Sequence, residues 1–262
     1  MKFSTFHILA VATILAWDVA HAHALHVGDI WVGLAGNQVV TGQVNPDQTI
    51  NASVRTFQST FGDSGFDYFT TSPGFDAALI FDPNFRIGFN MLAPCQFWNG
   101  TEFGPTAGET IRMSFLTLLQ TTGACFVPGF DLAVQPDGGW HRHFNMFLNP
   151  DGNGNRQLGI YLLKLELYYT KPGFQKSPAF WIVFNNQDTA ANQNLAIDWV
   201  IQHLVNCPAD VNRDNTVNVN DLLAVINAWG SSPCNAADVG GDSLVNVQDL
   251  LSVINSWGAC PQ

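Results

Sequence analysis

The C-terminal part of the chain contains one unit twice, and this duplication constrains the fold more than any other feature. Residues 210–230 and 238–258 align without a gap, at an offset of 28 positions (238 − 210). Each copy starts with a stretch rich in Asp and Asn and continues into an apolar stretch that ends in Trp-Gly. Because a unit this short cannot bury an apolar face alone, we expect the two copies to pack against each other.

The first half of each copy has the oxygen spacing of a calcium loop. Calcium takes six to eight oxygen ligands, and a 12-residue loop supplies them from positions 1, 3, 5, 7, 9 and 12. In the first copy these positions are Asp210, Asn212, Asp214, the Thr216 carbonyl, Asn218 and Asp221. The sharp turn at position 6 falls on Asn215, which tolerates a positive φ better than most other non-glycine residues. The alternative interpretation is a pair of Asx-rich turns that cap helices.

The second copy keeps all but one of these ligand positions. Its ligands are Asp238, Asp242, the Leu244 carbonyl, Asn246 and Asp249. Position 3 is Gly240, which has no side-chain oxygen, and Gly241 occupies the turn. Because a water molecule can replace the missing ligand at some loss of affinity, we expect two calcium ions, with the first copy as the tighter site.

Each loop should lead into a short helix. Asp221 and Asp249 stand at the helix starts, where the helix dipole stabilises a carboxylate. Apolar residues recur at i, i+3, i+4 and i+7, and we expect the two resulting stripes to face each other. The stripes are Leu222, Val225, Ile226 and Trp229 in the first copy and Leu250, Val253, Ile254 and Trp257 in the second. At loop position 8, Val217 should pair with the other loop.

A duplicated calcium loop with one exiting helix resembles the dockerin family. The resemblance covers about residues 207–262, and the first copy matches the pattern D-x-N-x-D-x-x-x-N-x-x-D-L-L in full. It implies two calcium ions held by the ligands named above, and docking to a cohesin domain on a scaffold or cell-surface protein. Loop positions 10 and 11, often Ser-Thr in the cellulosomal type, are Val219-Asn220 and Val247-Gln248 here, and the tryptophans at 229 and 257 also differ. The module is therefore similar to a divergent dockerin.

The N-terminus has the features of an export signal. Lys2 precedes an apolar run at residues 8–17, and small residues at 20, 22 and 24 form a cleavage site. The run is too short to span a bilayer. We expect residues 1–24 to be a signal peptide and the protein to be secreted, extracellular or at the cell surface, with the periplasm as an alternative. A net charge of −11 makes nucleic acid and anionic membranes poor partners.

Five cysteines in an oxidising compartment favour disulfide bonds. Cys95 and Cys125 lie in the first domain and are candidates to pair with each other. Cys207 and Cys260 flank the duplicated module, whose pseudo-twofold packing should bring its ends together, so we favour a bond between them. That leaves Cys234 over, and its pairing with Cys207 or Cys260 stays open.

Residues 25–206 are predicted to form a mainly β domain, an antiparallel β-sandwich or jelly roll with one closing helix, ahead of the module at 207–262. Gly and Pro punctuate the apolar runs, and Phe occurs 20 times. Apolar residues at helical spacing predict the closing helix at 189–206. The predicted strands are residues 29–34, 38–41, 86–91, 111–116, 130–134, 140–148, 159–169 and 180–185.

Histidines give the first domain its sharpest chemical feature. In the predicted strand 140–148, His141, His143 and Asn145 share one face and alternate with apolar residues. Two histidines at i and i+2 project in parallel and can grip one zinc or copper ion, which His26 near the mature N-terminus can join. The segment is also similar to a G-x-H-x-H … G-x-Y-x-L pattern of secreted bacterial surface repeats associated with metal handling. The alternative is a solvated polar strand face.

Catalytic candidates in the first domain are few. Glycoside hydrolysis needs two facing carboxylates, and the glutamates of this domain are Glu102, Glu109 and Glu166. Glu166 shares a strand face with Lys164, which fits a structural ion pair as well. Two further groups have both a functional and a structural interpretation. One group, which lines a carbohydrate-binding face or belongs to the β core, consists of Trp98, Trp140 and Trp181. The other, which is the start of a calcium loop or a hairpin turn, consists of Asp151, Asn153 and Asn155.

We therefore expect a secreted, non-catalytic protein whose dockerin-like module docks a β domain onto a cohesin-like or cell-surface partner. One alternative is a polysaccharide-degrading glycoside hydrolase that carries a dockerin, which a facing carboxylate pair in an open cleft would favour. The second alternative is an extracellular zinc- or copper-binding protein, which a convergence of His26 on His141 and His143 would favour. Whether the chain is an enzyme stays open at this point.

Overall fold

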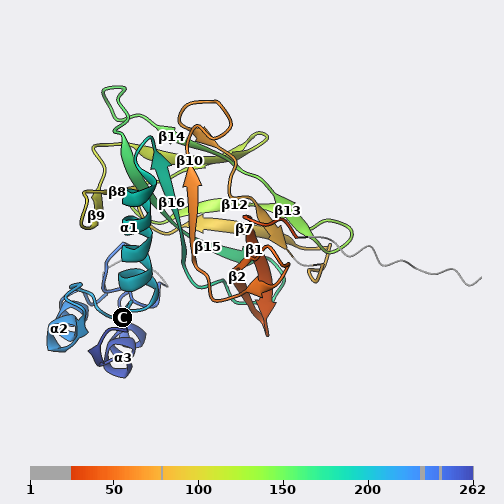
Figure 1. Cartoon of the computed structure of the whole chain (residues 1–262). Helices are drawn as coiled ribbons and strands as arrows, with labels where there is room; N and C mark the ends of the chain where they lie inside the picture. Colours follow the sequence, from red (N-terminus) through yellow and green to blue (C-terminus); the bar gives the residue numbers. More distant parts are fainter. Residues whose placement is uncertain (1–24, 78, 231–233, 242–243, 262) are drawn as a thin grey trace, which may run out of the picture.

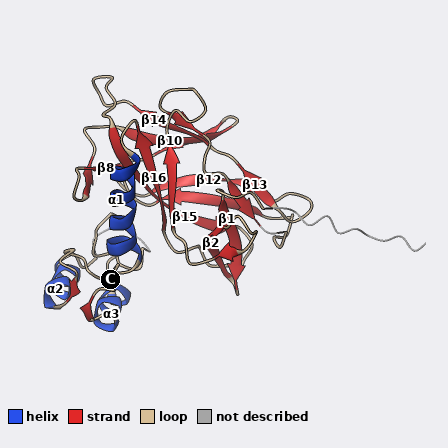
Figure 2. Cartoon of the chain, in the orientation of Figure 1, coloured by secondary structure: helices blue, strands red, loops and turns tan. Residues whose placement is uncertain are grey.

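The computed structural model describes residues 25–77, 79–230, 234–241 and 244–261. The expected signal peptide, residues 1–24, lies outside the described residues, and so does Asp242. Strands dominate the chain as far as residue 186, and helices follow from residue 190 (Figures 1 and 2). The prediction of a mainly β domain followed by a small helical module is confirmed. No helix within the described ranges is long and apolar enough to cross a membrane.

The described strands of the β domain form three sheets. The first has the order β13 (Trp140–Arg142), β6 (Phe75–Ala77), β1 (Ile30–Ala35), β2 (Gln38–Val44), β3 (Ile50–Asn51). The second has the order β11 (Leu118–Thr121), β10 (Thr110–Phe115), β14 (Asn145–Asn149), β5 (Phe69–Thr70). The third has the order β12 (Val127–Ala133), β7 (Arg86–Met91), β15 (Gly159–Tyr169), β16 (Phe180–Asn186), β4 (Thr56–Thr60), with β8 (Gln96–Trp98) and β9 (Phe103–Pro105) attached to β15.

The pairing is antiparallel with two exceptions. β1 pairs with β6, and β4 pairs with β16, in parallel. The predicted antiparallel arrangement therefore does not extend to these two pairs. Hairpins give antiparallel neighbours, whereas both parallel pairs join strands that are far apart in the sequence and need long connections. Apolar alternation predicts a strand but not which distant strand becomes its neighbour.

The third sheet is buried on both faces in its centre. Along β15, residues 161, 163, 165, 167 and 169 face the main core, while Ile160 and Leu162 face the opposite side. The same alternation holds in β16, where Trp181 and Val183 face outward. The helix α1 (Ala190–Val200) and its π-helical continuation Ile201–Val205 cover this outer side, with Ala196 and Val200 fully buried. The predicted closing helix is confirmed. Because it covers the outer face of the sheet, the central strands are apolar on both faces and their sequences are continuous apolar runs.

The predicted strand 140–148 is in fact two strands in two different sheets. β13 pairs with β6 in the first sheet, and β14 pairs with β10 and β5 in the second. The chain leaves the strand conformation at His143 and Phe144, between them. The alternation of apolar residues continues through the break, so the sequence pattern gives no sign of it.

Phe144 lies at this break and joins all three sheets. Its ring is 1% exposed. Ring centroids within 6.1 Å belong to Phe75 and Trp140 of the first sheet, Phe115 of the second, and Phe89 and Phe130 of the third. Most of these contacts are edge-to-face, which is the favourable geometry for aromatic pairs.

Replacing Phe144 with alanine should destabilise the β domain by about 3–5 kcal/mol, because it leaves a cavity where three sheets meet. Chemical denaturation of the full chain measures this loss. The matched control is Phe66→Ala, which removes a ring that is 69% exposed and should change stability by less than about 0.5 kcal/mol. Equal effects of the two substitutions would contradict the role assigned to Phe144.

Candidate functional sites

The module has a small core of its own. Helices α2 (Val219–Asn227) and α3 (Val247–Asn255) lie side by side (Figure 1). Their central residues Val225 and Val253 are fully buried. The prediction that the whole apolar stripe of each helix faces its partner is wrong in its second half. Ile226, Trp229, Ile254 and Trp257 are 47–54% exposed, because the loops and the Cys207–Cys260 bond complete the core instead.

Each loop pairs with the segment that follows the helix of the other copy. β17 (Thr216–Val217) pairs with β18 (Gly258–Ala259), which follows α3. At the equivalent place in the other copy, the Gly230 amide after α2 donates to the Val245 carbonyl at 2.8 Å. Val217 therefore pairs with Gly258, and the prediction that it pairs with the other loop is wrong. Both Val217 and Val245 are 1% exposed, so the pairing of each loop with the other copy closes the core of the module.

The first loop is wrapped around its carboxylates. Asp210 accepts the backbone amides of Asp214 at 3.1 Å and Asn215 at 2.8 Å. Asn215 has a φ of 67°, as its place at the turn requires. The side chains at positions 3, 5 and 9 meet, since the amide nitrogens of Asn212 and Asn218 lie 3.0 and 3.4 Å from Asp214 Oδ2. The loop thus brings the side chains of these three positions together, with the amide nitrogens of Asn212 and Asn218 directed at the Asp214 carboxylate.

The carboxylates at position 12 hold both loops in the same way. Asp221 and Asp249 are almost fully buried, and each accepts the backbone amides of positions 3 and 9 of its own loop. These distances are 3.1 and 2.8 Å in the first loop and 2.8 and 2.8 Å in the second. Asn218 and Asn246 form reciprocal capping boxes with them at the starts of α2 and α3. The two aspartates therefore lie in the first turn of the helices, and they stabilise the helix starts.

The second loop repeats this backbone although its position 3 has no side chain. Gly241 takes the turn with a φ of 72°. The side-chain amide of Asn246 donates to the Leu244 carbonyl at 3.1 Å, and that of Asn218 donates to the Thr216 carbonyl at 3.0 Å. Carboxylate, amide and carbonyl oxygens are the ligands that calcium takes in proteins, so the donor set of both loops fits this ion.

Two disulfide bonds involve the module. The favoured bond between Cys207 and Cys260 is present. Cys125 pairs with Cys234 instead of Cys95, which is a free, buried thiol. The candidate pairing of Cys95 with Cys125 is therefore not formed, because the module lies against the β domain and brings Cys234 to Cys125, across 109 positions of sequence. This bond ties the loop between the two copies to the β domain.

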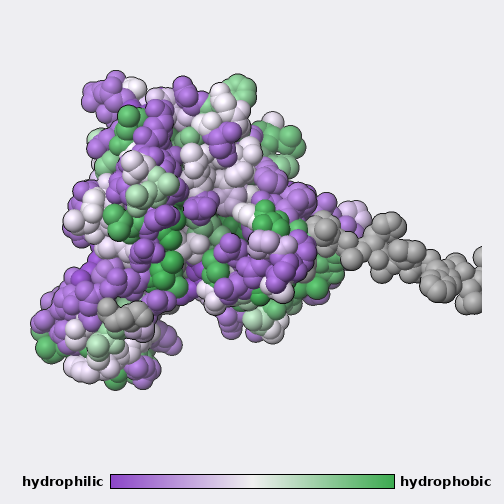
Figure 3. All heavy atoms as spheres, viewed as in Figure 1, coloured by the Kyte–Doolittle hydropathy of each residue, from purple (hydrophilic) through white to green (hydrophobic). Residues whose placement is uncertain are grey.

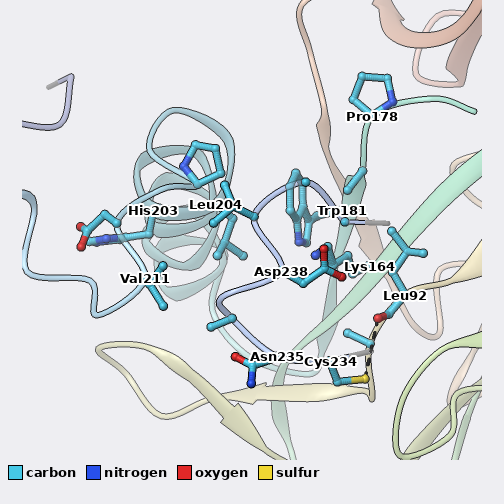
Figure 4. A pocket seen from close by; sticks show the side chains of 18 of the residues that line it. Leu92, Lys164, Pro178, Trp181, His203, Leu204, Val211, Cys234, Asn235 and Asp238 are labelled. Atoms are coloured by element: carbon cyan, nitrogen blue, oxygen red, sulfur yellow. Dashed lines mark hydrogen bonds between the residues drawn. The ribbon is translucent and has the colours of Figure 1, made fainter. Parts of the chain in front are cut away.

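The module and the β domain meet around a cavity of about 270 Å³. Trp181 and Lys164 line it from the third sheet, and Asp238, the first residue of the second loop, lines it from the module (Figure 4). Burial lowers the pKa of Lys164, and the negative charges of Asp238 and Glu166 oppose this effect. The first loop also contacts the β domain, since Gln202 donates to the Asn215 side chain at 2.9 Å. The module is held through both of its loops.

The histidines predicted as metal ligands come together despite the break in their strand. His141 Nε2 and His143 Nε2 are 3.1 Å apart, and the rings of His26 and His141 stack with centroids at 4.3 Å. Two aspartates that the sequence pattern did not single out join them. Asp29 Oδ2 lies 3.4 Å from His141 Nε2 and 3.5 Å from His143 Nε2, and Asp76 Oδ2 lies 2.9 Å from His26 Nδ1.

Neighbouring groups fix the orientation of this cluster. His143 Nδ1 lies 3.0 Å from the Thr71 carbonyl, which can accept only from a protonated nitrogen. When the ring is neutral, Nε2 is therefore its unprotonated nitrogen. Burial lowers the pKa of His141, helped by His26 and His143 and opposed by Asp76 and Asp29. Asn145, predicted on the same strand face, belongs to β14 and pairs with Ser114.

The remaining candidates have structural explanations. Glu109 is buried and accepts the Gln157 amide at 2.9 Å, and Glu166 pairs with Lys176 at 2.6 Å. Asp151 accepts the amides of residues 153 and 155, which makes the hairpin turn of the structural interpretation. Trp98, Trp140 and Trp181 are at most 5% exposed, so they cannot form an exposed carbohydrate-binding face.

Removing the Cys207–Cys260 bond with a double serine substitution should destabilise the module by about 4 kcal/mol, because the bond closes a loop of 53 positions in the unfolded chain. Thermal unfolding followed by the fluorescence of Trp229 and Trp257 measures the loss. The matched control is Cys95→Ala, which removes a thiol without breaking a cross-link. If the double variant unfolds at the same temperature as this control, the bond has no stabilising role.

Comparisons with known proteins bear on the module more than on the β domain. The family model of the dockerin type I domain matches residues 208–256. No curated protein is similar to the chain. Among solved structures, the chain is similar to the CooA pilin subunit from enterotoxigenic Escherichia coli, with 9% sequence identity, a TM-score of 0.26 and coverage of 53% of this chain and 92% of the pilin. A TM-score this low carries no argument about the β domain. Residues 208–256, with their duplicated loop and helix, thus match the dockerin type I domain, in agreement with the dockerin-like module predicted from the sequence.

Proposed function

We propose that this chain is an extracellular, non-catalytic docking protein. Its module binds two calcium ions and, when they are bound, attaches the β domain to a cohesin-type partner. The observation that carries the proposal is the duplicated hydrogen-bond network in which buried Asp221 and Asp249 close two loops of calcium-binding spacing. Dockerin type I domains in general bind calcium and dock to cohesins, which supports both parts.

The calcium ligands we assign follow the loop positions. The first ion is held by Asp210, Asn212, Asp214, the Thr216 carbonyl, Asn218 and Asp221. The second ion is held by Asp238, Asp242, the Leu244 carbonyl, Asn246 and Asp249, with one ligand fewer because position 3 is Gly240. Three carboxylates in each loop repel one another without an ion, so calcium supplies the charge that keeps them together.

The docking surface we assign consists of the outward faces of α2 and α3. On α2 it contains Val219, Leu223 and Ile226, with Trp229 just after the helix, and on α3 it contains Val247, Leu251 and Ile254, with Trp257 just after the helix. These side chains are 47–54% exposed, and apolar residues are visible on the outer surface of the module at the lower left of Figure 3. Apolar residues that recur on one exposed face of a folded domain are typical of a protein interface. The repeat gives the partner two nearly equivalent faces.

Calcium and docking are coupled through the capping boxes. Asp221 and Asp249 are at once loop ligands and first-turn residues of the helices that carry the docking faces. Loss of the ion therefore loosens the helix starts that position Val219 and Val247. The Cys125–Cys234 bond keeps the module against the β domain, so the partner receives the two as one unit.

Chelation should lower the unfolding temperature of the module, and calcium should restore it. At a calcium concentration about 100-fold above Kd, each site contributes about 2.7 kcal/mol. Asp221→Asn should remove more of this stabilisation than Asp249→Asn, because the first loop has the complete ligand set. Thermal unfolding with EDTA and with excess calcium measures both effects.

The control for this experiment is Asp198→Asn, which removes an exposed carboxylate of α1 that no loop uses. It should keep the full response to calcium. An unfolding temperature that does not change between EDTA and calcium would refute the calcium sites.

Substituting Leu223 and Leu251 together with aspartate should weaken binding to a cohesin domain by at least about 30-fold, because it places a charge at the centre of each docking face. Single substitutions should have smaller effects, since either face can serve. Surface plasmon resonance against a panel of type I cohesin domains, in calcium and in EDTA, measures the loss. Leu158→Asp, at an equally exposed leucine of the β domain, is the control. Binding that persists in EDTA or in the double variant contradicts the assigned surface.

A further inference from the structure

A cluster of candidate metal ligands, separate from the module, lies in the β domain. Asp29, His141 and His143 place one oxygen and two nitrogen atoms at the corners of a triangle with sides of 3.1, 3.4 and 3.5 Å. Two ligand atoms at the usual 2.0–2.1 Å from a tetrahedral zinc ion lie about 3.3 Å apart. The triangle therefore has the size of one face of a zinc coordination tetrahedron.

The three corners are already oriented toward one another. The Thr71 carbonyl accepts from His143 Nδ1 and so fixes the ring with its Nε2 beside His141 Nε2 and Asp29 Oδ2. The Gly74 amide donates to Asp29 Oδ1 at 2.8 Å, which aims the other oxygen at the histidines. A side chain at position 74 would collide with the His143 ring, at 2.5 Å from its nearest atom, so the glycine makes room for it. Such supporting contacts are typical of metal ligands, because they preset the ligand geometry.

One oxygen of the Asp29 carboxylate accepts no hydrogen bond within the described part of the chain. This oxygen, Oδ2, is buried. A buried carboxylate oxygen without a donor is unfavourable, since it has lost its hydration. A cation at the centre of the triangle would remove this penalty, and the two imidazoles beside it offer nitrogen ligands.

A fourth ligand is available on the open side. His26 stacks on His141, and its main-chain amide and Nδ1 both lie 2.9 Å from the fully buried Asp76 Oδ2. Ligand atoms of His26, Asp29, Asp76 and His141 all lie within 4.8 Å of one another. The pair Asp76–His26 thus has the form of a carboxylate that orients a metal-binding histidine through its second nitrogen.

We propose that Asp29, His141 and His143, with His26 as fourth ligand, bind one divalent first-row transition ion, and that this ion is zinc. Imidazole nitrogen with a single carboxylate suits zinc and copper, whereas calcium and magnesium prefer oxygen ligands alone. The inference does not rest on the docking function. The histidines of this site were predicted from the sequence. The structure adds Asp29 as a ligand and Asp76 as the carboxylate that orients His26.

Titration calorimetry of zinc into the full chain, purified without a histidine tag and kept in excess calcium, tests the proposal. We expect one zinc ion per chain. Asp29→Asn keeps the oxygen that accepts from Gly74 and removes the charge, and it should weaken zinc binding by at least about 100-fold. The double variant His141→Ala with His143→Ala should do the same, and His26→Ala should weaken binding by at least about 10-fold.

Two controls separate this centre from other zinc ligands. His203→Ala removes an imidazole of the π-helical segment that follows α1 and should leave the zinc affinity unchanged. Asp221→Asn damages a calcium loop and should also leave it unchanged, so failure of the calcium proposal does not affect this test. The proposal is overturned if the calcium-loaded chain binds no zinc, or if Asp29→Asn and the double histidine variant bind it as tightly as the original chain. Far-ultraviolet circular dichroism confirms that each variant is folded.

Discussion

The burial of Phe144 is the constraint on which the arrangement of the β domain depends. Its ring contacts aromatic residues from all three sheets, and it can reach them only because the chain leaves the first sheet after Arg142 and enters the second at Asn145. The same break turns His143 toward His141 instead of leaving the two in parallel along one strand. The core contact and the geometry of the histidine cluster are thus consequences of one change of direction in the chain.

The module depends on a different constraint, the duplication itself. Each loop is closed by a buried aspartate of its own helix, and each is paired with the segment that follows the other helix. Neither copy can therefore form alone. The Cys125–Cys234 bond and the contact of the loops with Lys164 and Gln202 then fix the module to the β domain. In this arrangement the outer faces of α2 and α3 remain exposed, and we assign docking to them.

Local patterns predicted local structure well. The loop spacing, the turns at Asn215 and Gly241, the closing helix, the Cys207–Cys260 bond and most strands of the β domain follow from residue type and period. What the sequence could not predict depends on contacts between distant segments. The parallel pairs, the partner of Cys125, the pairing of Val217 and the break at Phe144 are of this kind. Asp29 and Asp76 were missed as cluster members because Asp29 directly precedes β1 and Asp76 lies in β6, more than 60 residues before His141 and His143.

The central claim is that the duplicated loops are calcium sites of unequal strength. Calorimetric titration of calcium into the metal-free, oxidised full chain tests it most directly. We expect two ions per chain with different affinities, and we expect Asp221→Asn to abolish binding at the tighter site and to leave binding at the weaker site. Binding of no calcium, or two equal sites that Asp221→Asn does not affect, would contradict it.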